Sequence, residues 1–339
     1  MLQSTPKSIQ EFARQFNPAF QRYFLKLESE DTSFYKDLMY VETGITDLTI
    51  KESAMSGLAE ASTSTGENSA IVGDSPIELF EMSYTQFRIE TMMAFTEKHW
   101  KFGIQKRKLQ GVIKELRSAL NRKRERLAIG MVFDHAFDTS YSYTDQNGTH
   151  TVSTVGGDSV AAASAAHTRL DGGNNWSNVV TDQTGATNLP FDFEGLKAAH
   201  YISSLTPDHR GNPMNVDLDT LVCVKGSKVS FKAKEILKAI QKNELPGSFN
   251  HDGAAVGAFK VIELPALYVT AANRERWAMF DSKLKDMYHG YQYLESQPIK
   301  LDSPNLVYRT KQVEYTGTAW FTMGFNDIRG WVFSKGDRS

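Results

Sequence analysis

The chain has 339 residues and a formal net charge of −2, with 40% hydrophobic and 11% aromatic residues. This length is enough for one large core or two smaller ones, and the slightly acidic balance excludes a protein that is basic throughout, such as a histone-like DNA coat. No apolar run reaches the roughly 18 residues that a membrane span needs, so no membrane partner is expected. The single cysteine, Cys223, excludes an internal disulfide framework and a multi-cysteine zinc site.

Residues 1–43 are predicted to form an N-terminal arm rich in aromatic side chains. Apolar residues from Ile9 to Leu27 keep helical spacing, but Pro18 lies among them. Because a proline inside a helix removes a backbone hydrogen bond, two short amphipathic helices are expected here in place of one. The aromatic side chains need a surface to cover them, either in their own domain or on a neighbouring subunit.

Residues 44–90 indicate a long β-hairpin. Strand-like segments flank a middle rich in Ser, Thr, Gly and Ala, and the flexible tip is predicted at Ser62–Ala70. A two-stranded hairpin has little stability alone, so this one is expected to lie against another surface. Nine acidic residues and only two basic ones occur from Glu42 to Glu90, and we refer to residues 44–90 as the acidic hairpin.

The longest uninterrupted helical pattern runs from Gln105 to Phe137. Its apolar residues recur every three or four positions, which predicts one apolar stripe along a helix of roughly eight turns. Lysines and arginines occupy the remaining face: eleven basic and two acidic residues occur from Lys98 to Arg126. This helix is predicted to pack one side in its own domain and to present a basic side to a partner.

The contrast between the acidic hairpin and the basic helix predicts docking between copies of the chain, although two independently solvated faces would give the same pattern. The residues predicted for this subunit interface are Glu52, Glu60, Glu67, Asp74, Glu78, Glu81, Lys106, Arg107, Lys108, Arg117, Arg122, Lys123, Arg124 and Arg126.

The remainder of the chain is predicted to begin with a polar, irregular stretch and to continue as compact α/β structure. Residues 138–190 contain turn sequences at Asp145–Gly148 and Asp171–Asn174, where glycine permits a positive φ. Helices are expected at 193–205 and 229–240, strands at 218–224, 258–269 and 276–281, and β structure over 301–339, with a turn at 208–215.

No catalytic, cofactor-binding or metal-binding motif is found. None of the eight histidines forms a metal-ligand pair at helical spacing, and no serine-hydrolase, Walker or dinucleotide fingerprint occurs. Asp134, His135 and Asp138 lie together near the end of the long helix, where interaction of the histidine with the helix dipole is favoured over catalysis. Cys223 lies in an apolar strand with no adjacent base, as expected for an inert core thiol. The protein is therefore not expected to be an enzyme.

Taken in order, these features resemble the major capsid proteins of tailed bacteriophages, with the Hong Kong 97-like fold, and among them the Mu-like major head subunits. The local sequences that carry the resemblance are EKHWKFGIQKR before the long helix, DHRGNP before a strand and GFNDIRGWVFSKG near the C-terminus. The resemblance implies an α+β fold with an N-terminal arm (1–43), an extended E-loop hairpin (44–90), a peripheral domain (91–215 and 295–339) with a spine helix (105–137), and an axial domain (216–294).

The function implied by this resemblance is self-assembly into hexamers and pentamers of an icosahedral shell around double-stranded DNA. Implied partners are further copies of the chain, a portal protein, scaffolding, maturation-protease and decoration proteins, and packaged DNA on the inner face. The implied location is the virion, after assembly in the host cytoplasm. Two alternatives remain: a nucleic-acid-binding protein that uses the basic helix 105–137, and an enzyme with a site in the polar loops of 138–190. The net acidic charge disfavours the first, and the missing motifs disfavour the second.

Overall fold

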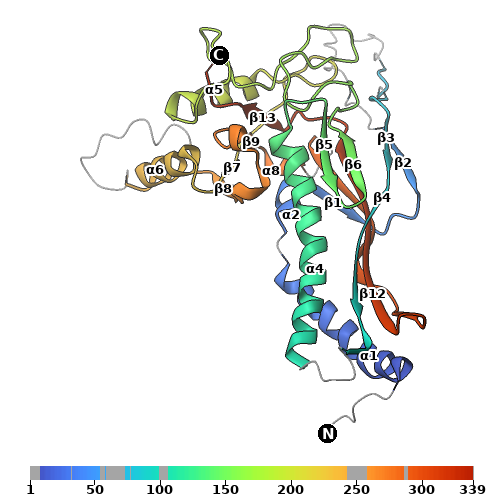
Figure 1. Ribbon diagram of the computed structural model, residues 1–339. Helices are drawn as coiled ribbons and strands as arrows, with labels where there is room; N and C mark the ends of the chain where they lie inside the picture. Colours follow the sequence, from blue (N-terminus) through green and yellow to red (C-terminus); the bar gives the residue numbers. More distant parts are fainter. Residues whose placement is uncertain are drawn as a thin grey trace.

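The computed structural model describes residues 8–31, 33–53, 58, 73–76, 78–98, 106–242, 258–285 and 289–338. These residues form two limbs that meet near the upper end of a long helix, α4 (Figure 1). One limb runs down along α4 and the longest strands, and the other carries α5, α6 and a smaller sheet. The buried apolar side chains form two clusters: one extends from the long limb onto one face of the smaller sheet, and the other lies between the opposite face of that sheet and the helices α5 and α6.

The long limb packs α4 against a five-stranded sheet. Its elements are α4 (Lys106–Ile129), β1 (Tyr40–Thr43), β4 (Phe87–Phe95), β10 (Tyr291–Leu301), β11 (Asn305–Val307) and β12 (Gln312–Phe325). The sheet order is β1-β10-β12-β11, and β4 pairs with the other side of β12. Ile113, Leu116 and Leu120 of α4 are buried, as the apolar stripe predicts. At Gly317 of β12 an added Cβ would lie 2.7 Å from Leu120 Cδ1, so glycine permits this close approach of helix and sheet.

The N-terminal arm packs on the same limb. Its first element is one continuous helix, α1 (Ile9–Lys26), so the prediction of two helices broken at Pro18 is wrong. Pro18 is exposed, whereas Phe12, Phe20 and Phe24 are buried against the sheet and α4. Burial of these rings on one face offsets the single hydrogen bond that the proline removes on the other.

Two further pieces complete the arm. The 3₁₀ turn Leu27–Glu30 follows α1, and α2 (Phe34–Leu38) then leads into β1. The Tyr35 ring of α2 lies 4.5 Å from the Tyr293 ring of β10, which fixes the arm on the sheet. In the described residues the arm is therefore covered by its own chain.

The end of α4 is wider than an ordinary α-helix. Gly130–Asp134 form a π-helical turn, in which the His135 amide donates to the Gly130 carbonyl at 2.9 Å. The helical stretch of 106–134 agrees with the helix predicted from Gln105 to Phe137, apart from its last residues.

A second hairpin follows, formed by β5 (Ser140–Asp145) and β6 (Gly148–Ser153). The prediction that 138–190 is irregular is therefore wrong for its first part. Tyr141 packs on Gly130, with its hydroxyl donating to the Leu127 carbonyl at 3.2 Å, and this contact holds the hairpin on α4. The remainder, from 154 to 192, contains turns and isolated bridges, as predicted.

The second limb is a four-stranded sheet with two helices. The sheet order is β13-β9-β7-β8, and the bounds are β7 (Thr220–Val224), β8 (Lys260–Leu264), β9 (Trp277–Phe280), β13 (Trp331–Ser334), α5 (Phe193–Ser204), α6 (Lys228–Lys242) and the single turn α8 (Ser282–Lys285). These elements agree closely with the predicted ranges, except that the strand predicted at 258–269 ends at Leu264 and a 3₁₀ turn at Ala266–Tyr268 follows it. Cys223 is fully buried in β7, and burial raises the pKa of its thiol to about 12, as expected for an inert core thiol.

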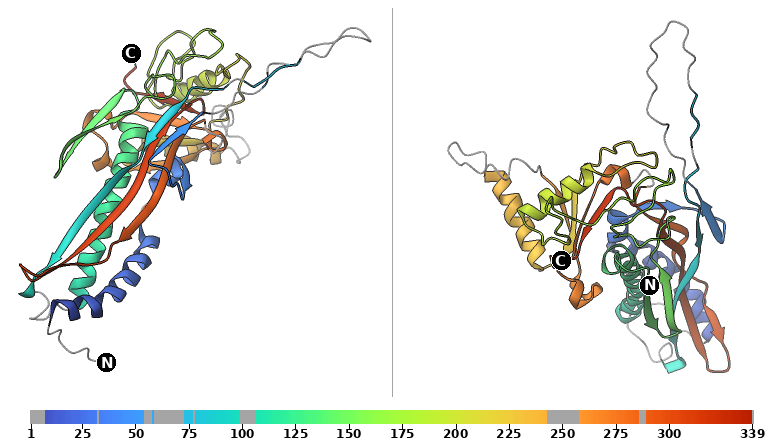
Figure 2. Two further views of the ribbon diagram at one scale, coloured as in Figure 1. Left: turned by 90° about the vertical axis from the view of Figure 1, so that its right-hand side faces the viewer. Right: turned by 90° about the horizontal axis from the view of Figure 1, so that it is seen from above.

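The acidic hairpin is described only at its base. There β2 (Thr49–Glu52) pairs antiparallel with β3 (Met82–Thr85), which confirms the predicted hairpin pairing. The predicted tip at Ser62–Ala70 lies outside the described residues. Figure 2 shows the base of this hairpin at the opposite side of the molecule from α6.

Candidate assembly surfaces

Arg117 of α4 is buried inside the chain and does not belong to an exposed basic face. Its side chain is 4% exposed, and its Nη2 lies 2.7 Å from Asp31 Oδ2 in the arm. Its Nη1 donates to the Phe24 carbonyl at 3.0 Å, and the guanidinium lies over the Phe24 ring at 4.9 Å. Arg117 therefore joins the spine to the arm of the same subunit.

Arg124 is also buried, in a cluster between α4, α2 and β10. It lies over the Tyr35 ring at 4.3 Å, and its Nη1 is 3.8 Å from Glu295 Oε1. Glu125 beside it is completely buried, and burial raises the pKa of its carboxyl to about 7 despite the neighbouring Arg124. Burial also raises the pKa of Glu295. In both carboxyls burial is the main cause of the raised pKa, and the nearby Arg124 offsets it only in part.

The other predicted basic residues of α4 lie nearer the surface. Lys123 pairs with Asp145 at 3.0 Å and lies over the Tyr143 ring at 3.7 Å, so it fixes the β5–β6 hairpin. Arg122 and Arg126 are exposed; Arg122 is 3.6 Å from Glu115, and Arg126 lies over the Tyr268 ring at 5.8 Å. The side chains of Lys106, Arg107 and Lys108 lie outside the described part.

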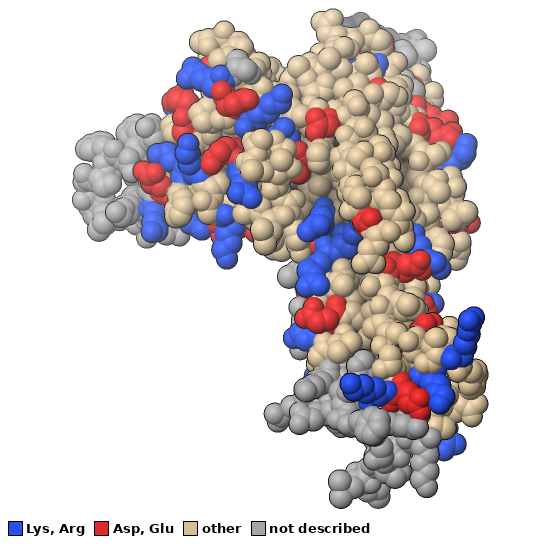
Figure 3. All heavy atoms as spheres, viewed as in Figure 1, with Lys and Arg blue, Asp and Glu red and all other residues tan. Residues whose placement is uncertain are grey.

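The surface view agrees with this distribution. Along α4 in Figure 3, blue patches are separated by tan and red spheres and form no continuous basic stripe on the face that is drawn. A long phosphate backbone would find only scattered cations there.

The predicted acidic residues at the base of the acidic hairpin have partners in their own chain. Glu52 accepts a hydrogen bond from Gln292 at 3.0 Å, and Glu78 accepts one from Ser53 at 2.9 Å. Burial raises the pKa of Glu52. Glu60 and Glu67 lie outside the described residues.

Two ion pairs fix the direction of the hairpin. Lys51 Nζ lies 2.6 Å from Glu81 across the β2–β3 pair. Arg210 binds Asp74 with Nη1 at 2.8 and 3.1 Å from the two carboxylate oxygens, and this contact joins the return strand to the turn at 208–213. These contacts bring the acidic residues together with the body of the chain and not with the basic residues of α4.

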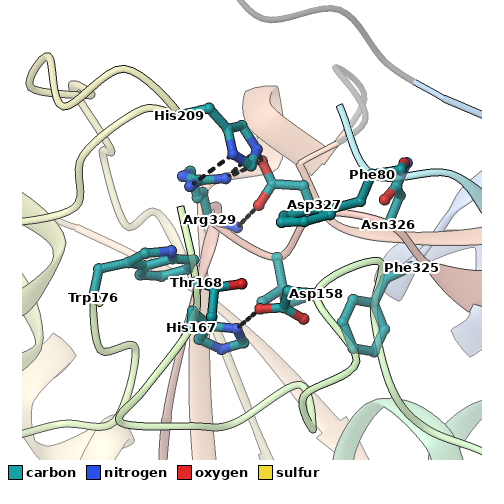
Figure 4. A pocket seen from close by; sticks show the side chains of 11 residues that line it. Phe80, Asp158, His167, Thr168, Trp176, His209, Phe325, Asn326, Asp327 and Arg329 are labelled. Carbon is teal, nitrogen blue, oxygen red and sulfur yellow. Dashed lines mark hydrogen bonds and ion pairs between the residues drawn. The ribbon is translucent and has the colours of Figure 1, made fainter. Parts of the chain in front are cut away.

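A buried polar cluster, not predicted from the sequence, lies beneath this turn (Figure 4). Arg329 Nη1 is 2.8 Å from Asp327 Oδ2 and 2.6 Å from His209 Nε2, and His289 Nδ1 is 2.8 Å from the same Asp327 oxygen. Burial alone would raise the pKa of the Asp327 carboxyl, but Arg329 and the hydrogen bonds from the two histidines hold it well below its usual value. The Phe80 ring meets His209 edge-on at 6.0 Å, so the cluster also supports the acidic hairpin.

This cluster of charged side chains has a structural role. Its charged groups are paired with one another, as buried charges require, and none is arranged as a nucleophile beside a base. Two of the quoted sequence segments contain members of this cluster, GFNDIRGW with Asp327 and Arg329 and DHRGNP with His209, but neither contains His289 or indicates that these residues meet.

Asp134 at the end of the spine likewise has a structural role. It accepts hydrogen bonds from Thr270 Oγ1 at 2.8 Å and from Asn273 Nδ2 at 2.7 Å, and so holds the two limbs together. His135 bonds Asp138 at 2.9 Å and stacks on Tyr141. Within the described residues no group of three potential metal ligands occurs, and no described helix is long and apolar enough to cross a membrane.

No family model and no curated protein sequence matches this chain. The capsid structure of the cyanophage P-SCSP1u aligns with 90% of this chain and 88% of its own, at 10% identity and a TM-score of 0.50. This chain has the fold of a phage capsid protein. A virus-like particle protein from Pyrococcus furiosus (9% identity, TM-score 0.48, 94% and 98% of the two chains) and a structure from Mycobacterium phage Bobi (13% identity, TM-score 0.46, 90% of each chain) are also similar.

The resemblance inferred from the sequence is thus confirmed at the level of the phage capsid fold. Mixed helices and strands, the long helix and the paired base of the acidic hairpin all agree with it.

Proposed function

We propose that this protein is the major subunit of an icosahedral phage capsid, which assembles into hexamers and pentamers and encloses double-stranded DNA. The observation that carries the proposal is the capsid fold, which extends over 90% of the chain. Residues 1–43 would be the arm and the acidic hairpin (44–90) the E-loop. The peripheral domain would comprise residues 91–215, with the spine, and 295–339, and the axial domain residues 216–294. Further partners would be a portal protein and scaffolding, protease and decoration proteins. The protein would be located in the virion, which is assembled in the host cytoplasm.

Two features of the described chain support assembly. The acidic hairpin and the β5–β6 hairpin are both two-stranded sheets, which have open edges and little stability alone. Arg122 and Arg126 remain exposed on the spine and are the described members of the predicted basic surface that a neighbouring copy could contact. Arg117 and Arg124 are assigned to the fold of the subunit.

The direct test is negative-stain electron microscopy of the purified protein together with sedimentation velocity. We expect shells, or rings of five and six subunits, which appear as the concentration rises. A protein that stays monomeric at all accessible concentrations and salt conditions, also when co-expressed with its phage assembly proteins, would contradict the proposal.

Nucleic-acid binding by α4 is the alternative, and binding through phosphates would weaken steeply with salt. Burial of Arg117 and Arg124 reduces the cations that α4 can offer. This alternative would be favoured if the protein stays monomeric, forms no rings and binds duplex DNA with a strong salt dependence. That salt dependence should then be lost in the double variant Arg122→Gln/Arg126→Gln.

A further inference from the structure

The solvent face of α6 combines lysines with one exposed aromatic ring. Val229, Ala233 and Ile236 are buried on the opposite face of the helix. Phe231 is 67% exposed and lies at the centre of the solvent face. At helical spacing, the residues around it are Lys228, Lys232, Lys234, Glu235 and Lys238.

Part of the positive charge on this face is not neutralised by any other described residue. Lys232 pairs with Glu235 at 3.0 Å, and Lys234 pairs with Glu263. Among the described residues, Lys228 and Lys238 have no carboxylate within ion-pair distance. A large ring exposed among lysines contributes nothing to the core of the limb, and such rings are typical anchors of protein–protein contacts.

Residues 42–48, which run from the end of β1 to the start of β2, have the complementary character. Leu48 is 63% exposed, and Glu42, in β1, and Asp47, directly before Leu48, are exposed as well. Neither carboxylate has a lysine or arginine within ion-pair distance in the described part of the chain. The segment is held in place, because the Leu48 carbonyl accepts a hydrogen bond from the Gln86 amide at 2.9 Å. An exposed apolar side chain, preceded by exposed acids, is therefore held on a fixed backbone.

The two patches lie on opposite sides of the molecule. In Figure 1, α6 is at the far left and β2, which follows Leu48, is at the far right; the view from above in Figure 2 agrees. Two different, complementary patches on opposite sides cannot meet within one chain, but they can join successive copies head to tail. Contacts of this heterologous kind close into rings when the rotation between copies permits it.

We propose that α6 of one copy binds the 42–48 segment of the next copy, with Phe231 against Leu48 and the lysines of α6 around Glu42 and Asp47. The partner is a second copy of this chain. The inference rests on the proposed capsid function and adds to it the contact that would order subunits around a ring.

Charge reversal on each side tests the contact. The variants Glu42→Lys/Asp47→Lys and Lys228→Glu/Lys238→Glu should each lower the yield of rings at least about ten-fold, because like charges then face each other. Phe231→Ser should have a similar effect. Combining all four reversals in one chain should restore rings. Lys26→Glu/Lys283→Glu, an equal change of net charge at exposed lysines elsewhere, is the control and should assemble normally.

Mixing the two double variants gives a more specific test of the contact. Each double variant alone should not form rings, whereas an equimolar mixture permits rings in which the two variants alternate. Alternation closes only in rings with an even number of subunits, so six-membered rings should return and five-membered rings should not. Circular dichroism and thermal unfolding of each variant establish that the subunit is folded.

The outcomes distinguish this inference from the proposed function. Rings from wild-type protein together with normal rings from both double variants would overturn the inference and leave the capsid proposal intact. Normal rings from Lys228→Glu/Lys238→Glu with reduced retention of duplex DNA would overturn it as well, and would assign α6 to nucleic acid. Wild-type protein that stays monomeric under all these conditions, with neither rings nor shells, would overturn both.

Discussion

Arg117 of α4 and Asp31 of the arm form a buried ion pair in which both Nε and Nη2 approach the same carboxylate oxygen, at 2.8 and 2.7 Å. The two residues are separated by 86 positions in the sequence, and the pair connects the arm to the spine. Because the arginine is 4% exposed, its charge depends on this partner and on the Phe24 carbonyl. The arm is therefore held on its own subunit by a polar contact as well as by its aromatic rings.

Replacing Arg117 by methionine should strongly destabilise the subunit. The change leaves Asp31 without its partner in a site that water scarcely reaches, and breaking a buried pair costs about 3–5 kcal/mol. Urea unfolding of the subunit measures the loss. The matched control is Arg122→Met, because Arg122 is exposed on the same helix and should cost no more than about 0.5 kcal/mol. Equal losses in the two variants would contradict the importance of the buried pair.

Glu125 should make the subunit less stable as the pH rises. Burial raises the pKa of its carboxyl to about 7 in the folded chain, from 4.5. A raised pKa means that the folded state binds the proton more tightly, so the stabilisation is complete below pH 4.5 and is lost as the pH rises through about 7.

The variant Glu125→Gln carries a neutral side chain of the same shape and should remove this dependence. At pH 8.5 it should exceed the wild type in unfolding free energy by roughly 2–3 kcal/mol, and at pH 5 the two should be nearly equal. Arg124, Asp31 and Glu295 face the same cluster and are present in both proteins, so the difference between the two curves reports the contribution of Glu125. Parallel curves would refute the assignment, and the exposed Glu115→Gln should leave the wild-type curve unchanged.

Protonation of Asp327 should make the subunit less stable as the pH falls, the opposite of the dependence expected for Glu125. Its pKa is held well below 3.8, so its stabilisation is present above pH 3.8 and is lost as the pH falls through the folded value. Asp327→Asn leaves Arg329 buried without a carboxylate and should cost about 3 kcal/mol at pH 7. Thermal unfolding at pH 7 measures this cost, which should shrink at pH values below 3.8, and Asp47→Asn, at an exposed acid, is the control. A loss no larger than that of the control would show that the cluster does not stabilise the fold.

The comparison between sequence and structure is most instructive for α4. The spacing of Ile113, Leu116 and Leu120 predicted the helix and its buried stripe correctly. Arg117 and Arg124 were assigned to the exposed face because charged residues usually lie there. Their burial depends on Asp31 and Glu295, which approach only in the folded chain, and no local pattern reports such partners.

Other departures have local causes. The β5–β6 hairpin could have been predicted, because hydroxyl residues alternate with Tyr141 and Tyr143 before the Asp145–Gly148 turn and with His150 and Val152 after it. Pro18 was given too much weight, since a helix with a well-buried aromatic face tolerates a proline on its exposed side. The base of the acidic hairpin was predicted from alternation, but its ion pair with Arg210 was not, because that arginine belongs to a distant turn.

The contact between Gly317 and Leu120 offers a test of how closely the spine packs on the sheet. A Cβ at position 317 would lie 2.7 Å from Leu120 Cδ1, so Gly317→Ala should overpack the core and cost about 1–3 kcal/mol of unfolding free energy. Leu120→Ala opens a cavity and should cost about 2–5 kcal/mol. In the double variant the new methyl group occupies part of that cavity, so the double should be no less stable than Leu120→Ala alone. Gly111→Ala, in the same helix with nothing within 4 Å of the added Cβ, is the control and should stabilise by about 0.5–1 kcal/mol. Additive losses in the double variant would show that Gly317 and Leu120 do not share this space.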